Sequence, residues 1–202
     1  MPLDQPPSFV INLRRDGERW KRCEKHFSEV GVKADRFFGL DYERTGLFTI
    51  HKYEVDNPGY TMGPKTVSLH LSHYMLWNVL LRQPGDSFWV LEDDCLWDSD
   101  WRPRWEQAIK SLPKDWDLLY LGSCCAKDKP GWKVNDNLHV VQFPQCTHAY
   151  QVRKKALPLM LEHCEKVWAP VDICLVLDVL PKLQHFTILP RLCGQHDTLL
   201  PP

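Results

Sequence analysis

The sequence lacks any apolar run long enough to cross a membrane, and its first residues lack the basic start and apolar core of a signal peptide. We therefore expect no membrane span and a cytoplasmic protein, either complete or one domain of a longer chain. An excess of one charge is also missing, because 25 Lys and Arg residues are matched by 26 Asp and Glu residues. Without a basic excess, we expect no nucleic acid partner.

The eight cysteines lack the C-x-x-C spacing of zinc and redox sites, since the closest pair, Cys124 and Cys125, is adjacent. A chain of 202 residues can bury a core without covalent cross-links. Four cysteines stand among apolar residues, as buried free thiols do: Cys23, Cys95, Cys164 and Cys174. We therefore favour free cysteines over disulfides and expect no zinc site.

What the sequence does contain is an alternation of short apolar runs and helical patterns. Strands are predicted at 9–13, 36–40, 88–92, 117–122, 139–143, 147–152 and 186–190. Helices are predicted from Asp16, over 65–82, from Trp101 to Pro113, over 153–166 and over 172–180, and 41–64 is predicted to be a long loop. The alternation predicts one α/β domain over 9–202 after a tail at 1–8, with a mainly parallel sheet.

Three consecutive acids, Glu92, Asp93 and Asp94, end the apolar run FWVL. Ligands of parallel α/β sheets bind beyond the carboxyl ends of the strands, which is where these acids lie. Adjacent carboxylates repel one another, and Mg²⁺ or Mn²⁺ would neutralise them while also binding substrate phosphates. Glu92 and Asp94 would project to one side and Asp93 toward the scaffold. The alternative is a solvated strand end, and nucleases and phosphatases also use acid pairs.

A second candidate site is the segment VINLRRDGERW (10–20), in which a strand turns into a helix. Arg14, Arg15 and Arg19 cluster at the predicted helix N-terminus, and both features attract phosphate. The segment lacks the glycines of a P-loop or a dinucleotide-binding turn. A basic helix surface is therefore an equally good interpretation.

Three further residues have a plain structural explanation beside a functional one. His73 lies in the leucine stripe of the 65–82 helix, where a histidine is usually a core residue. Asp172 precedes an apolar helix, so it is either an N-cap or a general base. His196, near the end of the chain, is either a surface residue or a third ligand that completes a Mn²⁺ site with the acids.

The motifs together resemble glycosyltransferase family 25, which includes lipooligosaccharide galactosyltransferases and collagen hydroxylysine galactosyltransferases. The resemblance covers about residues 9–197. Its motifs occur in this order: VINLRRDGERW, FFGLD, SLHLSHYMLW, WVLEDD, WDLLYLG, THAYQVRKKAL, PVD and PRLCGQ. It implies a GT-A type, Rossmann-like fold and an inverting transfer of galactose or glucose from UDP-galactose or UDP-glucose to a glycan or glycoprotein.

The resemblance also implies roles for individual residues. WVLEDD matches the acidic metal motif of the family, which assigns Glu92 and Asp94 to Mn²⁺ or Mg²⁺ and to the donor. The uridine diphosphate would lie at the first strand and turn, which contain Ile11, Asn12, Leu13 and Arg15, with Arg19 in the helix that follows. His73 matches the Ser-His pair of the donor pocket, and Asp172 matches the acid that we expect to act as the base.

Nine tryptophans exceed what a core of this size needs, so we expect Trp97, Trp101 and Trp132 to be exposed and to contact sugar rings. Two other functions fit the same sequence. One is a non-catalytic module with this fold that binds a UDP-sugar or glycan, because 202 residues are few for such an enzyme. The other is a metal-dependent nuclease, which the near-neutral charge disfavours.

Overall fold

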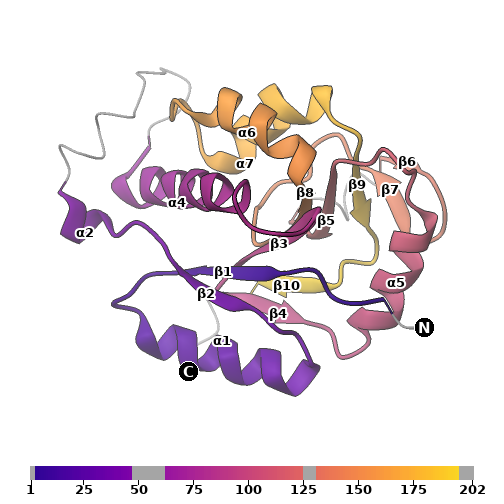
Figure 1. Cartoon of the computed structure of the whole chain (residues 1–202), viewed down its shortest axis with the longest axis horizontal. Coiled ribbons are helices and arrows are strands. Elements are labelled where there is room, and N and C mark those ends of the chain that lie inside the picture. The colour runs from indigo at the N-terminus through magenta and orange to yellow at the C-terminus, as the bar shows by residue number, and fades with distance from the viewer. Residues whose placement is uncertain (1–2, 47–61, 125–130, 196–202) are drawn as a thin grey trace.

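An eight-stranded sheet runs through the centre of the computed structural model, which describes residues 3–46, 62–124 and 131–195 (Figure 1). In spatial order its strands are β2 (Asp35–Phe38), β1 (Ser8–Asn12), β3 (Ser87–Glu92), β8 (Ala149–Arg153), β5 (Leu118–Gly122), β9 (His185–Ile188), β7 (Leu138–Val140) and β6 (Trp132–Lys133). β8 and β7 run antiparallel to both of their neighbours, and the other strands share one direction. This sheet confirms the predicted Rossmann-like α/β fold of GT-A type.

The inner strands of the sheet are nearly continuous apolar runs. Phe88 to Leu91 in β3 and Leu118 to Leu121 in β5 are fully buried. Such runs are typical of strands that are covered on both faces. Because β1 pairs in parallel with β3, Asn12 at the end of β1 and Glu92 at the end of β3 reach the same edge of the sheet.

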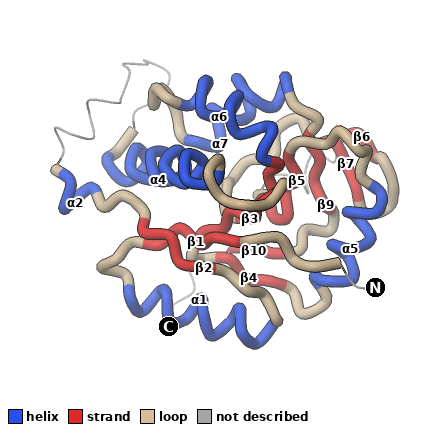
Figure 2. Tube along the Cα trace, in the orientation of Figure 1, coloured by secondary structure: helices blue, strands red, loops and turns tan. Residues whose placement is uncertain are grey.

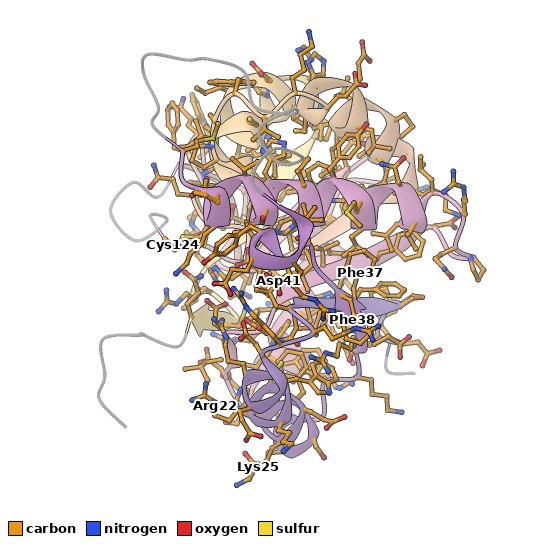
Figure 3. The ribbon with its side chains drawn as sticks, turned by 90° about the vertical axis from the view of Figure 1, so that its left-hand side faces the viewer. Arg22, Lys25, Phe37, Phe38, Asp41 and Cys124 are labelled. Carbon is orange, nitrogen blue, oxygen red and sulfur yellow. A yellow bond between two sulfur atoms is a disulfide. The ribbon has the colours of Figure 1, made fainter. Side chains whose placement is uncertain are left out.

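Helices cover both faces of the sheet (Figures 1 and 2). One face packs against α4 (Pro64–Leu80), α6 (Leu157–Cys164) and α7 (Val171–Cys174), and the other against α1 (Gly17–Val30) and α5 (Trp101–Ser111). The exposed side of α1 is polar, and Figure 3 shows Arg22 and Lys25 there, away from the sheet.

Helix α4 confirms the prediction that the apolar segment over 65–82 is a buried helix. Apolar residues occupy most of its circumference, and the buried residues include Leu76, Trp77 and Leu80. With 17 residues, two of them histidines, α4 is shorter and less apolar than a membrane-spanning helix. Across 3–46, 62–124 and 131–195, no helix is both long and apolar enough to cross a bilayer.

The face toward α1 and α5 holds a cluster of four tryptophans. Trp89 stacks on Trp97, with ring centroids 5.0 Å apart, and makes edge contacts with Trp101 and Trp105. The expectation that Trp97 and Trp101 are exposed was wrong, because they are 4% and 1% exposed. The tryptophan excess fills this core, and of the three candidates only Trp132, at 80%, is exposed.

Several short elements depart from the sequence prediction. The predicted loop over 41–64 contains a short helix, α2 (Tyr42–Thr45), and its residues 47–61 lie outside the described part of the chain. The small sheet formed by β4 (Cys95–Trp97) and β10 (Cys193–Gln195) was not predicted. Two short helical turns lie within the predicted helices, η1 (Lys154–Ala156) and η2 (Leu175–Val179), and a third, η3 (Leu180–Lys182), extends the second helix by two residues.

The preference for free cysteines was wrong at one pair. A disulfide joins Cys124, after β5, to Cys146, before β8, and their Cα atoms are 5.8 Å apart. The pairing depends on the antiparallel contact between β5 and β8, which local spacing in the sequence does not reveal. The four cysteines predicted to be buried free thiols are confirmed, and Cys193 is a fifth.

Candidate functional site

A cavity of about 310 Å³ opens where β1 and β3 end, between α1 and α4. Ligand sites in α/β sheets form at this carboxyl edge. Eight of the residues that line the cavity were predicted from the sequence: Ile11, Asn12, Leu13, Arg15, Arg19, Glu92, Asp93 and Asp94. The structure therefore brings together the two segments that the sequence separates by about 80 positions.

Asp93 joins these two segments. Its carboxylate accepts a hydrogen bond from the Asn12 side chain and forms an ion pair with Arg19 at the start of α1. Arg36 in turn donates to the Asn12 Oδ1 atom at 2.9 Å. Burial raises the pKa of Asp93, although the contacts with Asn12 and Arg19 oppose that rise. Asp93 therefore faces the scaffold, and its main role is to fix the acidic turn beside β1.

Glu92 is held from the opposite side. Its Oε1 atom accepts a hydrogen bond from Thr147 Oγ1 at 2.8 Å and lies 3.3 Å from His73 Nε2. Burial on its own would raise the pKa of Glu92, but the hydrogen bonds from His73 and Thr147 outweigh it, so the pKa is lowered. Glu92 thus lines the cavity as an ionised carboxylate.

His73 supports Glu92 from behind and is not a lining residue of the cavity. Its ring is fully buried, and its Nδ1 atom is 3.0 Å from the Tyr150 hydroxyl, which accepts a hydrogen bond from Trp77 Nε1 at 2.7 Å. Both ring nitrogens of His73 form hydrogen bonds when the Tyr150 hydroxyl donates to Nδ1 and the Nε2–H group donates to Glu92 Oε1. Thus His73 is a core residue that contacts the cavity through Glu92, and its assignment to a donor pocket stays a prediction.

Asp94 is the least satisfied of the three acids. Its Oδ1 atom is buried and has no hydrogen-bond partner among the described residues, and its Oδ2 atom accepts only a long 3.3 Å contact from Gln195. Arg19 approaches this carboxylate no closer than 4.0 Å. Burial and the nearby charge of Glu92 raise the pKa of Asp94 to about 6. Such a carboxylate is stabilised by any cation that reaches it.

A hard divalent cation fits this site through Asp94. The three carboxylates do not form a complete cage of metal ligands, because each contacts different partners. Glu92 accepts a hydrogen bond from Thr147, and Asp93 accepts one from Asn12. Magnesium and manganese are commonly bound by one or two carboxylates plus substrate oxygens, and that arrangement needs no cage. His196, the predicted third ligand, lies outside the described residues, and its neighbour Gln195 contacts Asp94.

The basic residues of the cavity differ in how far they are already paired. Arg15 forms ion pairs with Asp41 and Glu43 at the entrance to α2, so its charge is shared with acids. Lys65, in the first turn of α4, also lines the cavity and was not selected from the sequence. Its position after Gly63 and Pro64 at a helix start is a signal that could have identified it.

Asp172, the predicted base, lies in α7 and is not a lining residue of the cavity. It is the second residue of the helix, after Pro170 at the N-cap position. Its Oδ2 atom accepts a hydrogen bond from the Cys146 backbone N–H at 3.1 Å. The next residue, Thr147, donates to Glu92, so a single short segment connects Asp172 to the cavity.

Other lining residues were also missed, among them Tyr42, Ser68 and Ser72. Ser72 accepts a hydrogen bond from the Leu40 backbone N–H at 2.8 Å and so fixes the chain that follows β2 against α4. The sequence pointed to Ser72 only as the neighbour of His73. Tyr42 and Ser68 come from segments whose approach to β1 depends on the tertiary fold.

The fold and this acid-lined cavity define a Rossmann-like protein with a candidate ligand site at the carboxyl edge of its sheet. The model of glycosyltransferase family 25, described as an LPS biosynthesis protein family, matches residues 5–130. The chain therefore belongs to glycosyltransferase family 25.

Several curated proteins of this family are similar to the chain. A glycosyltransferase 25 family member from Drosophila melanogaster is 28% identical over 182 residues, which are 81% of this chain and 29% of that protein. Procollagen galactosyltransferase 1 from Danio rerio is 26% identical over 125 residues, or 56% of this chain and 21% of that protein. Inactive glycosyltransferase 25 family member 3 from Homo sapiens is 29% identical over 125 residues, with the same coverage. The chain thus spans less than a third of the length of these relatives.

Two solved structures resemble the fold weakly. A glycosyltransferase involved in the glycosylation of the major capsid of PBCV-1 has a TM-score of 0.48 and 10% identity, over 90% of this chain and 81% of that one. The inositol-1-phosphate CTP transferase from T. maritima has a TM-score of 0.44 and 14% identity, over 95% of this chain and 91% of that one.

Proposed function

We propose that the chain binds UDP-galactose or UDP-glucose in the cavity and transfers the hexose, with inversion, to a hydroxyl of a glycan or glycoprotein. Membership of glycosyltransferase family 25 supports sugar transfer. The name of the Danio rerio relative, procollagen galactosyltransferase 1, supports galactose as the sugar and a protein acceptor.

The observation that carries this proposal is the unpartnered Oδ1 atom of Asp94 in the cavity wall. A buried carboxylate without a partner is costly, so its presence favours a cationic ligand at this position. We assign this ligand to Mn²⁺ or Mg²⁺. When bound there, the ion would neutralise the negative charge that develops on the departing diphosphate.

The remaining residues of the cavity have separate tasks in this proposal. Asn12, Arg19 and Asp93 hold the acidic turn at a fixed distance from β1. Glu92, kept ionised by Thr147 and His73, can accept hydrogen bonds from hydroxyl groups of the bound sugar or ribose. Arg15 and Lys65 add positive charge on the α4 side, where a diphosphate would be attracted.

Asp172 is our candidate for the base that accepts the proton of the acceptor hydroxyl. Two adjacent residues support this choice, because the Cys146 N–H donates to Asp172 and the Thr147 hydroxyl donates to Glu92. General base catalysis contributes about 10²–10⁴-fold to a rate, so Asp172→Asn should lower kcat by that factor without weakening donor binding. An unchanged kcat would remove Asp172 from the mechanism.

A second function is supported by one of the comparisons. The human relative is named an inactive family member, and the chain spans only 21% of it. A module that binds a UDP-sugar or glycan without turnover is therefore the alternative. Such a module would use the same cavity residues but would need no base.

The two functions are separated by measuring both UDP release and binding. The chain is incubated with UDP-galactose or UDP-glucose, an acceptor glycan and Mn²⁺, and binding is followed by calorimetry. We expect turnover that Asp94→Ala abolishes and that Asp136→Ala leaves unchanged, since the Asp136 side chain is 90% exposed on the β6–β7 turn. Binding without turnover would support the module, and the absence of both would contradict the proposed ligand.

A further inference from the structure

A second cluster of metal-ligating side chains lies at the ends of β5 and β8, separate from the acids of the cavity. Cys124 and Cys146, which form the disulfide, and His148 place one ligand atom each within 4.8 Å of one another. Among the described residues, this is the one group of three or more His, Cys, Asp or Glu side chains with that geometry. Cys124 is exposed, and Figure 3 labels it, whereas Cys146 is half-buried.

His148 supplies an independent indication of a ligand. Its ring is fully buried, and its Nδ1 atom has no hydrogen-bond partner among the described residues. The other ring nitrogen, Nε2, lies 3.4 Å from the Cys193 carbonyl oxygen, and the Cys193 side chain also forms a hydrogen bond with the imidazole. A buried ring nitrogen normally has a partner, and metal coordination is one way to satisfy the lone pair of Nδ1.

The backbone is arranged so that these three side chains meet. Gly122 ends β5, and a Cβ atom there would lie 2.3 Å from His148 Nε2, so only glycine allows the histidine ring to approach. Cys146 adopts a φ of 71°, which is rare for a residue with a side chain and turns Cys146 into the disulfide. Thr147, between Cys146 and His148, turns to Glu92.

We propose that, once the disulfide is reduced, Cys124, Cys146 and His148 bind one Zn²⁺ ion. Sulfur and imidazole ligands select zinc over the hard ions that suit carboxylates. Two thiolates and one imidazole leave the fourth position of a tetrahedral ion for water. Ligand atoms around such an ion are separated by about 3.5–4 Å, so the three side chains need only small movements to reach it.

The chemical step balances with a dithiol as the reductant. The dithiol gives two electrons and two protons, which break the bond between the Cys124 and Cys146 sulfurs and produce two thiols, while the dithiol itself becomes a disulfide. Zinc then replaces the two thiol protons, which pass to solvent, and the neutral His148 ring adds its lone pair.

The proposed zinc site would also affect the cavity, because its ligands Cys146 and His148 lie on either side of Thr147, which contacts Glu92. The Cys146 backbone N–H donates to Asp172, and the Thr147 hydroxyl donates to Glu92. Either the disulfide or the zinc ion would hold this segment in place, whereas two free thiols would not. The zinc site itself does not depend on the proposed sugar transfer.

The test is a titration of the reduced chain with Co²⁺ under anaerobic conditions, followed by displacement with Zn²⁺. We expect one Co²⁺ per chain with a sulfur-to-cobalt charge-transfer band, and no such band before reduction. Cys124→Ser and Cys146→Ser should each weaken binding more than about 100-fold, because loss of an outer-shell partner already costs 10–100-fold. Cys164→Ser, at a buried thiol on α6, is the matched control and should leave the band unchanged.

X-ray absorption at the zinc edge then identifies the ligands without substituting the buried histidine. We expect two sulfurs at about 2.3 Å and an imidazole nitrogen at about 2.0 Å. A shell made only of oxygen and nitrogen, a band that persists in Cys124→Ser, or equal binding by the unreduced chain would each overturn the proposal.

Discussion

The two faces of the central sheet are packed with different kinds of side chain. The face toward α1 and α5 is filled by indole rings. Trp89 and Trp105 both donate to Gln151 Oε1 at 3.0 Å, whereas the Trp97 N–H has no acceptor among the described residues. The face toward α4 and α6 contains hydroxyl and imidazole groups, and one chain of them runs from Trp77 through Tyr150 and His73 to Glu92. The comparison indicates that one face mainly supplies stability and the other positions the site.

The largest expected effect is on the tryptophan face. Trp89→Ala removes a fully buried ring that contacts three other tryptophans, so the free energy of unfolding should fall by about 3–5 kcal/mol. Urea denaturation measures this change. Trp132→Ala, at an 80% exposed ring, should change stability little. Equal losses in the two variants would contradict the assignment of stability to this cluster.

A smaller effect should come from the polar chain on the opposite face. Tyr150→Phe leaves the Trp77 indole N–H without its acceptor and His73 without its hydroxyl contact, which should cost about 1–3 kcal/mol. The matched control is Tyr120→Phe, because the Tyr120 hydroxyl is equally buried but has no hydrogen-bond partner among the described residues.

Tyr120→Phe should therefore be neutral or slightly stabilising in the same denaturation experiment. The two tyrosines lie side by side in neighbouring strands, with ring centroids 6.4 Å apart. A similar loss in both variants would mean that ring packing, and not the hydrogen-bonded chain, determines the stability of this face.

The smallest expected effect is at the carboxyl edge of the sheet, where a substitution should raise the free energy of unfolding instead of lowering it. Asp94→Asn keeps the shape of the side chain and removes a buried charge that lies near Glu92. At pH 7, without metal, the free energy of unfolding should rise by about 1–2 kcal/mol.

This gain should depend on pH in a defined direction. The ordinary pKa of Asp is 3.8, and the folded chain raises that of Asp94 to about 6, so between these values the folded state binds more protons than the unfolded state. The stability of the wild-type chain should therefore fall, relative to Asp94→Asn, as the pH rises from 4 to 6. Thermal denaturation of both proteins across this range measures the difference, and a gain that is constant with pH would contradict the raised pKa.

Much of the fold followed from the sequence because its signals are local. The apolar runs of β1, β3 and β5 and the leucine stripe of α4 depend on burial alone, and these elements formed as predicted. The pairing of β4 with β10 was missed, because each strand is three residues long and its partner lies about 100 positions away. Local patterns contain no information about such a pairing.

The residues of the site also divide into those that local sequence patterns predicted and those that they did not. Asn12, Arg19 and the three acids were found because they lie at or shortly after the ends of apolar strands. Lys65, Tyr42 and Thr147 reach the site only through the tertiary fold. The Cys124–Cys146 disulfide was missed for the same physical reason. The metal and the donor remain predictions, and they depend most on Asp94.

The central claim is that Asp94 and a divalent ion hold the diphosphate of a UDP-sugar in this cavity. A crystal structure of the chain with UDP and Mn²⁺ tests the claim most directly, because the anomalous signal of manganese locates the ion independently of the nucleotide. We predict the ion at about 2.0–2.3 Å from an Asp94 oxygen, with the uridine near Asn12 and Arg19. Manganese and nucleotide bound away from Asp94 would contradict the account.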